Sequence, residues 1–379
     1  MKRTKIIIFI SIILIFIFYN IIPLYATTLD DIIEEQKKVY DLEYLEDQVP
    51  DSADEAARDL DEPLTIENVA GFLKPEKIFS YIINIIIKIA KDKGSIILKL
   101  GAILAVVYVT GSLSETYASN GILKIISYIS LVISSLILFE SIFNTSKTLI
   151  SSLNDISSFM QSLIPIMAAL LGASGNPASG AVGGLVLFTA IEVFSVIINS
   201  FIIPCTNMYL SLGVGAGLTG NINLKGISAF LRNAAVICIT FILTIFIGIM
   251  SLQKVLAMSG DSLTKRALKF AAGSFIPVAG GPIGEGLETV FACAGSLKSS
   301  AGVFGLIIIF LIVLAPILEI FFQWFILDIA VNLSNFFNNS ILSSFFSITR
   351  DVFAILLTLA LGYSVMLFLM LTLMTMIGS

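Results

Sequence analysis

Six carboxylates lie inside otherwise apolar stretches of this sequence, and they are the side chains best placed to do chemistry. An ionised group in hydrocarbon costs free energy, so such residues need a compensating role. They could line a hydrated path or bind a cation, or they could cap helix ends and pair with nearby lysines. The second interpretation is favoured for two of them that lie near the ends of apolar runs, and a functional role is favoured for the one in the middle of a run. Glu140 and Asp328 are the two near the ends of apolar runs, and Glu192 is the one in the middle of a run. The remaining three are Glu285, Glu288 and Glu319.

The spacing of the acids adds to this pattern. Glu285 and Glu288 are three residues apart and follow Gly280, Gly281 and Pro282, while Glu319 is four residues before Gln323. Residues three or four apart share one face of a helix. Each pair is therefore expected to present its polar groups together.

Other reactive groups are missing or incomplete in the sequence. The chain has no histidine, which excludes histidine-dependent catalytic triads, histidine–metal sites and imidazole proton relays. It has no GxxxxGK[ST] phosphate-binding motif either, so any energy must come from a gradient or from a partner. We expect no enzyme activity, no cofactor and no metal site. No basic face with interleaved aromatic residues is present, so specific nucleic-acid binding is not expected.

The elements that must position the acids are membrane helices. The chain has 379 residues, of which 57% are hydrophobic and 13% charged, whereas soluble domains carry roughly 25% charged residues. This predicts an all-α polytopic membrane protein with about six to eight membrane segments. Clear spans are expected at about 100–118, 122–143, 181–203, 227–250, 302–327 and 351–377.

Two further stretches, about 155–175 and 270–297, are apolar but rich in Gly, Ser and Pro. Backbone of this kind is tolerated at membrane depth only where protein or a wet cavity surrounds it, which predicts broken or re-entrant helices. The two stretches resemble each other, since residues 162–166 (SLIPI) recur as residues 274–278 (SFIPV), 112 positions later. At the same offset Pro165 corresponds to Pro277 and Gly172 to Gly284.

This similarity predicts an internal repeat with units of about 122–210 and 227–325. The alternative is that two segments of similar composition match by coincidence. Duplicated units that each contain a discontinuous helix are a recurrent plan of transport proteins. The residues predicted to form a conduit or gate are Glu192, Glu285, Glu288, Glu319, Pro165, Pro277, Gly280, Gly281 and Gly284.

The N-terminal part has a different character. Residues 1–26 consist of a basic start and an apolar run, which predicts a signal peptide or signal anchor. Residues 27–77 form an acidic segment that is expected to be extracytoplasmic, either as a solvated spacer or as a docking arm. Residues 78–95 are apolar with lysines at the end and too short to span, which predicts an interfacial amphipathic helix before the polytopic domain 96–379.

The loops give an incomplete topology. The loop with Lys254, Lys265, Arg266, Lys269 and Lys298 is the most basic and is expected in the cytoplasm. If residue 95 lies outside the cytoplasm, a cytoplasmic basic loop requires 155–175 to cross the membrane fully. If 78–95 itself crosses the membrane, 155–175 can be re-entrant.

The segment 269–281 (KFAAGSFIPVAGG), followed by Glu285, Glu288, Cys293 and Lys298, resembles the stage III sporulation protein AE family. The resemblance covers nearly the whole chain and is most specific over about 265–305. It implies a protein made in the mother cell of endospore-forming bacteria and located in the membrane around the forespore. It also implies partners: the stage III sporulation proteins AA to AH, including an ATPase, and stage II sporulation protein Q.

The resemblance thus implies a component of the channel between mother cell and forespore, required for late forespore gene expression and forespore integrity. It brings no catalytic residue and leaves the transported species open. Two alternatives stay open beside it. One is a gradient-driven secondary transporter that acts alone, and the other is a non-conducting membrane scaffold for the complex.

Overall fold

The computed structural model describes residues 43–58, 60, 64–66, 68, 75–117, 120–173, 177–219, 222–257 and 300–377. Every regular element in these ranges is a helix, in agreement with the predicted all-α class. Two short helices, α3 (Glu43–Asp47) and α4 (Asp51–Arg58), precede the long ones. The long helices are α6 (Pro75–Tyr117), α7 (Asn120–Ala173), α8 (Pro177–Ile197), α9 (Ile203–Thr219), α10 (Ile222–Ala257), α13 (Ser300–Phe336) and α14 (Ser340–Ile377). A short π-helix, η2 (Ile198–Ile202), joins α8 to α9.

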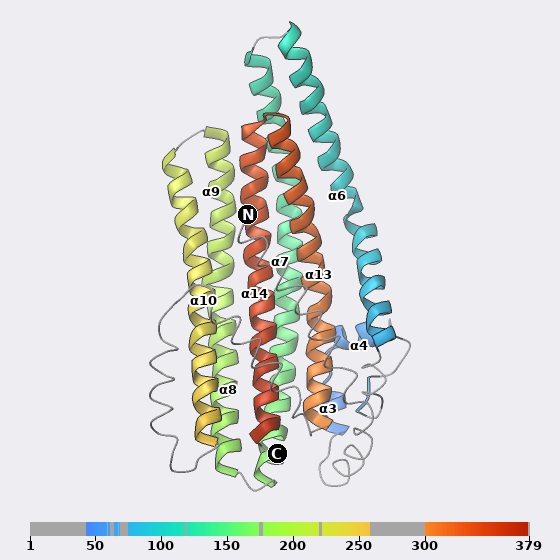
Figure 1. The fold of residues 1–379 in the computed structure, drawn as a ribbon, viewed down its shortest axis with the longest axis vertical. Helices are drawn as coiled ribbons and strands as arrows, with labels where there is room; N and C mark the ends of the chain where they lie inside the picture. Colours follow the sequence, from blue (N-terminus) through green and yellow to red (C-terminus); the bar gives the residue numbers. More distant parts are fainter. Residues whose placement is uncertain are drawn as a thin grey trace.

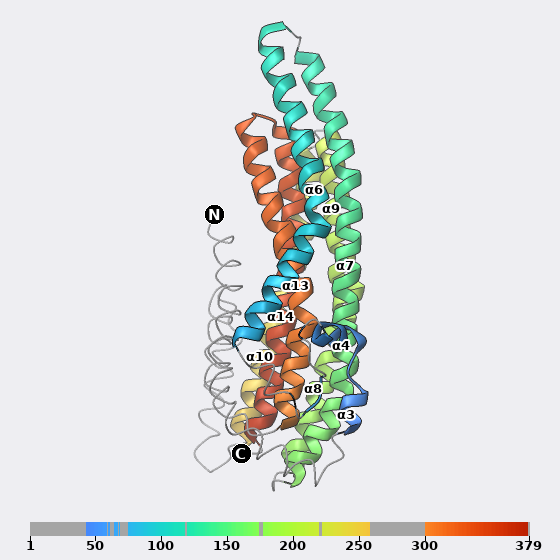
Figure 2. The same cartoon turned by 90° about the vertical axis from the view of Figure 1, so that its right-hand side faces the viewer.

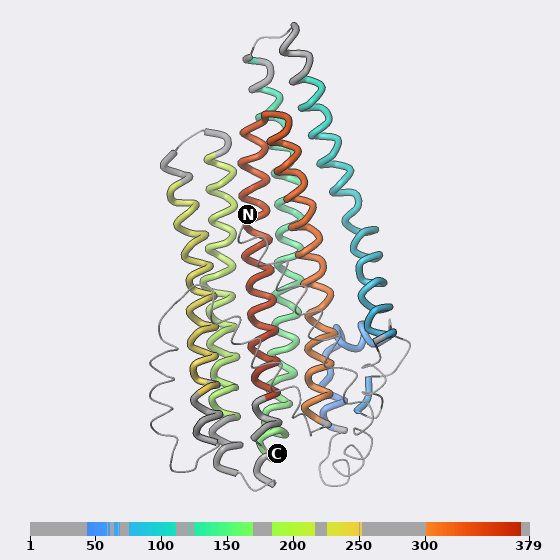
Figure 3. The backbone as a smooth tube through the Cα atoms, in the orientation of Figure 1, coloured from blue at the N-terminus to red at the C-terminus, as the bar shows by residue number. Residues whose placement is uncertain are grey.

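The long helices form an elongated bundle in which the chain alternates direction (Figure 1). Helices α6, α8 to α9 and α13 run one way, and α7, α10 and α14 run the other way. The distal parts of α6 and α7 extend beyond the remaining helices at one end of the bundle, as the perpendicular view shows (Figure 2). The tube in Figure 3 makes the same alternation easy to follow.

Within the described ranges, six helical stretches are long and apolar enough to cross a membrane, the first at Glu76–Thr110 and the last at Ser340–Thr372. Two of them form the centre of the bundle. In the most apolar 18-residue stretch of each helix, 83% of α13 and 78% of α14 is buried, against 17% of α6 and of α10. The peripheral helices therefore leave most of their apolar surface for lipid or for other chains. The chain is a multi-pass membrane protein.

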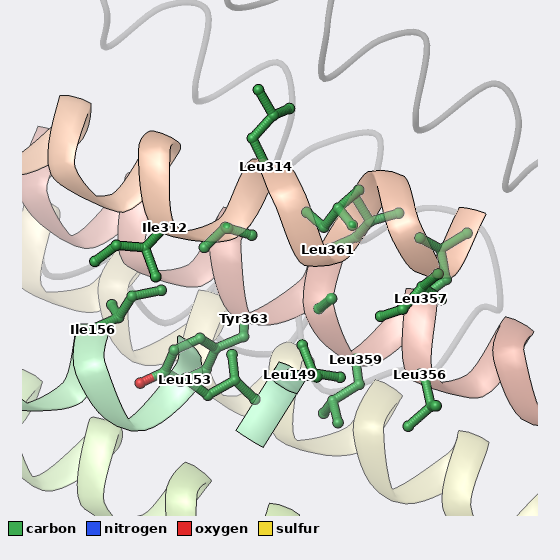
Figure 4. Packing of buried hydrophobic residues seen from close by; sticks show 14 of the residues in the cluster. Leu149, Leu153, Ile156, Ile312, Leu314, Leu356, Leu357, Leu359, Leu361 and Tyr363 are labelled. Atoms are coloured by element: carbon green, nitrogen blue, oxygen red, sulfur yellow. The ribbon is translucent and has the colours of Figure 1, made fainter. Parts of the chain in front are cut away.

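The core lies between α13, α14 and α7. Leu356, Leu357, Leu359 and Tyr363 of α14 lie among Leu149, Leu153 and Ile156 of α7 and Ile312 of α13 (Figure 4). Large aromatic side chains fill the same centre, with Phe304, Phe345 and Phe353 at most 1% exposed. Helices that are apolar on all sides become buried in this way when other helices surround them.

The structure differs from the sequence predictions at both short apolar segments that it describes. Residues 78–95 are not a separate helix, because α6 continues without a break from Pro75 to Tyr117. The stretch 155–175 is not broken at Pro165 either, since this proline lies inside the continuous helix α7. Proline removes one helical hydrogen bond, but the flanking Leu163 and Ile164 are buried, and this packing favours the continuous helix. The stretch 270–297 lies outside the described residues.

The predicted span 181–203 corresponds to α8 with η2. Here the N–H of Ile203 bonds to the carbonyl of Ile198, five residues back. Pro204 follows directly and has no N–H to donate, so the wider π-turn accommodates it without ending the helix. The sequence predicted a clear span here, and the π-helix within it was not predicted.

The acidic segment is partly folded onto the bundle. Helix α4 contacts α13, and its Ala53 and Ala57 are buried while Asp51 and Glu55 are exposed. The Ser52 hydroxyl donates a 2.8 Å hydrogen bond to Asp155 of α7. Residues 51–58 are therefore a docked helix with an acidic outer face, and not a free spacer.

The internal repeat remains a prediction, because the second copy of the SLIPI motif lies outside the described residues. Pro204 and Pro316 are also 112 positions apart; Pro204 is the second residue of α9, just after the π-helix, whereas Pro316 lies inside the regular helix α13. Both prolines belong to the first arm of a helical hairpin, α9 with α10 and α13 with α14.

Candidate functional site

A network of polar side chains joins α6, α7 and α13. Lys93 of α6 forms an ion pair with Glu319 of α13, with 2.8 Å between Nζ and Oε1. Thr145 of α7 donates a 2.9 Å hydrogen bond to the same oxygen, and Gln323 Nε2 donates to Thr145 at 2.7 Å and to Glu319 at 3.2 Å. Ser141 donates to the Gln323 carbonyl oxygen. We call these five residues the Lys93 network.

A second network joins α9, α10, α13 and α14. Asp351 of α14 lies between two guanidinium groups, 2.8 Å from Arg232 Nε of α10 and 3.5 Å from Arg350 Nη2. Arg350 continues to Asp328 of α13 at 2.9 Å, and the Tyr209 hydroxyl of α9 donates to Asp351 at 3.3 Å. In this Arg350 network two positive and two negative charges balance, which lowers the cost of keeping them inside apolar helices.

The two networks use different faces of α13. Glu319 and Asp328 are nine residues apart, which at about 100° per residue places them on roughly opposite sides of the helix. Glu319 and Gln323 do share one face, as their spacing predicted, and Asn332 donates to Asp328 on the other. Helix α13 therefore holds α6 and α7 on one side and α14 on the other through polar contacts.

A third polar region lies between α7 and α8. Glu192 of α8 accepts a 2.6 Å hydrogen bond from Gln161 Nε2 of α7. Asn154 lies two turns before Gln161 on α7, and Ser195 and Asn199 lie three and seven residues after Glu192. These spacings place the polar groups on facing sides of the two helices. We call Asn154, Gln161, Glu192, Ser195 and Asn199 the Glu192 seam.

A small cavity lies in this seam. It has a volume of about 10 Å³ and is lined by Asn154, Ser195, Asn199 and Tyr363, together with Ile150, Leu153 and Ile198. A volume of this size holds about one water molecule. The Tyr363 side chain is buried, and no described group bonds its hydroxyl with hydrogen-bond geometry, although Ser157 lies close by.

The structure thus places the predicted residues in different settings. Glu319 belongs to the Lys93 network. Asp328 belongs to the Arg350 network, where it pairs with an arginine of α14 and not with a nearby lysine. Glu192 lies at the α7–α8 contact, and Pro165 and Glu140 are exposed on α7. Pro277, Gly280, Gly281, Gly284, Glu285 and Glu288 lie outside the described residues. Among the described residues, no group of three or more His, Cys, Asp or Glu side chains could hold a metal ion.

Sequence reasoning missed the basic partners. The sequence placed Lys93 at the end of an interfacial helix and Asp351 at the start of the span 351–377, and it gave Arg350 no role. The available signal was the presence of basic residues within or beside apolar runs, since such residues pair with acids in membrane helices. Which acid each one meets depends on the packing of helices far apart in sequence.

Comparison with known proteins decides the family. The family model described as stage III sporulation protein AE matches residues 64–378. The chain belongs to this family. Stage III sporulation protein AE of Bacillus subtilis (strain 168) is 27% identical over 303 residues, which cover 80% of this chain and 75% of the relative. No solved structure matches the chain.

Membership of the stage III sporulation protein AE family makes this chain a membrane protein of endospore formation. The match begins within the acidic segment and runs through every long helix of the bundle. The family is one of sporulation membrane proteins and not a known family of enzymes.

Proposed function

We propose that this chain is a multi-pass component of the channel complex between mother cell and forespore, and that it forms part of the membrane conduit or its gate. In this proposal it lies in the mother-cell membrane around the forespore. Its partners are the stage III sporulation proteins AA to AH, among them the ATPase, and stage II sporulation protein Q. Membership of the AE family supports the assignment of this chain to endospore formation.

The charges between the helices favour a gate over a scaffold. Three ion pairs, Lys93–Glu319, Arg350–Asp328 and Arg232–Asp351, connect helices of an otherwise apolar bundle. Apolar contacts alone would hold such helices together at lower cost, because burying charges costs several kcal/mol per ion and pairing only offsets it. Ionisable residues kept inside membrane helices generally serve transport or a change of conformation. This set of ion pairs is the observation that carries the proposal.

In this proposal the helix bundle of a single chain corresponds to a closed gate. Its centre is filled by Phe304, Phe345, Phe353 and the leucines of α14. A conduit therefore forms either when helices rearrange around the two networks or where this chain meets its partners.

The proposal is tested by neutral substitutions in a sporulating strain that depends on this chain. Glu192→Gln, Glu319→Gln and Asp328→Asn are expected to lower late forespore gene expression and the yield of heat-resistant spores while the protein still reaches the membrane. Glu140→Gln, on the exposed side of α7, is the matched control and is expected to leave both readouts unchanged. Full sporulation by all three variants would refute the gate and favour the scaffold.

Co-purification separates the proposal from a transporter that acts alone. The tagged chain, extracted from sporulating cells with mild detergent, is expected to retain other stage III sporulation proteins. Recovery of the chain without them, together with loss of function in the neutral variants, would favour the secondary transporter.

A further inference from the structure

The seam between α7 and α8 differs from the two charged networks in one respect. Glu319, Asp328 and Asp351 each lie within 2.9 Å of a basic group. Glu192 instead contacts the neutral amide of Gln161, and no basic side chain among the described residues forms an ion pair with it. Glu192 lies inside the apolar span Gly184–Ala216. A carboxylate in this position needs a bound cation or a proton, because isolated charges are strongly disfavoured in an apolar region.

The neighbouring cavity offers oxygen atoms to such a cation. Its polar lining comes from the side chains of Asn154, Ser195, Asn199 and Tyr363. Ser195 is one helical turn from Glu192, and the Glu192 carboxylate lies close enough to interact electrostatically with Tyr363. The Tyr363 hydroxyl is buried and lines the cavity without a hydrogen bond of normal geometry.

Two prolines remove backbone N–H donors from the helices that carry the seam. Pro165 has no N–H, so the carbonyl of Gln161 loses its usual donor four residues later. In the same way, Pro204 cannot donate to the carbonyl of Ser200, next to the π-helix η2. π-Helices are frequent at functional sites. Each proline thus removes one N–H donor from its helix, Pro165 from α7 and Pro204 from α9.

We propose that the Glu192 seam is a binding site for a dehydrated monovalent cation of the size of Na⁺, with the oxygens of Asn154, Ser195, Asn199 and Tyr363 as ligands and Glu192 as the balancing charge. Oxygen ligands suit hard cations, and a cavity for one water molecule suits a small ion without its hydration shell. One carboxylate balances one positive charge, so a divalent ion would leave a net charge in the apolar span.

This site does not rest on the proposed channel function, and it can be tested on the purified full-length chain in detergent. A ligand that binds only the folded state raises the melting temperature in proportion to its free energy of binding. Thermal unfolding is measured in NaCl and in choline chloride at equal ionic strength. We expect NaCl to raise the melting temperature by about 2 °C or more at a tenfold excess over Kd, with a smaller shift for KCl.

Variants separate the site from a general effect of salt. Glu192→Gln is expected to abolish the difference between NaCl and choline chloride, and Tyr363→Phe to reduce the apparent affinity for Na⁺ at least severalfold. Glu140→Gln, an exposed acid on α7, is the matched control and is expected to keep the full shift.

The readout is the Na⁺-dependent difference, so a change in the absolute stability of a variant does not obscure it. If Glu192→Gln does not yield folded protein, the Na⁺ titration of Tyr363→Phe decides instead. Equal melting temperatures of the unmodified chain in the two salts would overturn the proposal, and so would an unchanged Na⁺ shift in a folded variant of the site. Stabilisation that depends on pH but not on Na⁺ would also overturn it and would indicate that Glu192 binds only a proton.

Discussion

The Lys93–Glu319 pair shows how a single residue can hold two helices inside an apolar bundle. Both side chains are largely buried, with 20% and 17% of their surface exposed, and Glu319 also accepts hydrogen bonds from Thr145 and Gln323. Removal of one partner leaves the other charge without compensation, which costs more than the pair itself contributes. This asymmetry can be measured.

Glu319→Gln is expected to lower the free energy of unfolding by about 1–3 kcal/mol, because Lys93 then lies buried beside a neutral amide. The double variant Lys93→Met with Glu319→Gln is expected to lose less than the sum of the two single variants. Chemical unfolding in detergent, followed by circular dichroism, measures all three. Strict additivity would mean that the two side chains do not interact in the folded protein.

At the scale of the helix, close packing depends on a few glycines. A Cβ atom at Gly213 of α9 would lie 2.5 Å and 2.9 Å from two atoms of Ile348 on α14. A Cβ atom at Gly248 of α10 would meet nothing within 4 Å. Small residues at such contacts let membrane helices approach closely. Substitution by alanine should therefore lower the free energy of unfolding at Gly213 and leave it unchanged or raise it at Gly248.

Gly213→Ala is expected to destabilise the protein by about 1–3 kcal/mol through overpacking against Ile348. Gly248→Ala is expected to be neutral or to stabilise it by up to about 1 kcal/mol, since alanine favours the helix more than glycine does. Unfolding midpoints of the two variants provide the comparison. A destabilised Gly248→Ala together with an unaffected Gly213→Ala would contradict the α9–α14 contact.

The docking of α4 is a second property of an element. Ala53 faces the bundle and is fully buried, whereas Glu55 on the same helix is exposed. Ala53→Lys is expected to release α4 and to increase tryptic cleavage in residues 51–58 severalfold. Glu55→Lys introduces the same cleavable residue on the outer face and is expected to leave α4 docked. Equal cleavage of the two variants would show that α4 is not held by its alanine face.

At the scale of the whole molecule, the alternating helices limit the topology. Four long segments, α6, α7, α8 to α9 and α10, separate the acidic segment from the basic loop that begins near Lys254, and they alternate in direction (Figure 1). If each segment crosses once, the acidic segment and the basic loop lie on the same side of the membrane. The two predicted locations, extracytoplasmic for one and cytoplasmic for the other, cannot then both be correct.

Single cysteines at Glu55 and Ser300, in a background without the native cysteines, test this topology. We expect both positions to react with an impermeant thiol reagent from the same side, because an even number of crossings separates them. Labelling in intact cells and in opened cells identifies that side. Reaction from opposite sides would mean that one of the four segments does not cross the membrane.

The sequence by itself determined the all-α membrane class, most of the spans and the family, since each of these depends on local composition or on a contiguous motif. It also predicted that Glu319 and Gln323 share a face, because helical periodicity is a local property. It predicted a separate interfacial helix over 78–95 and a broken or re-entrant helix over 155–175, whereas α6 and α7 are continuous there. Local apolar length and a proline suggested these breaks, whereas packing against neighbouring helices keeps the backbone continuous.

Only the tertiary structure decided which charges meet. Lys93 lies more than two hundred residues from Glu319, and Arg232 more than one hundred from Asp351. Such pairs follow from how the helices pack, and a single sequence does not record them. The same packing leaves Glu192 with Gln161 and brings the Tyr363 hydroxyl to the cavity beside it. A carboxylate that sequence alone could only mark as costly thus lies near a small cavity with polar side chains in its lining.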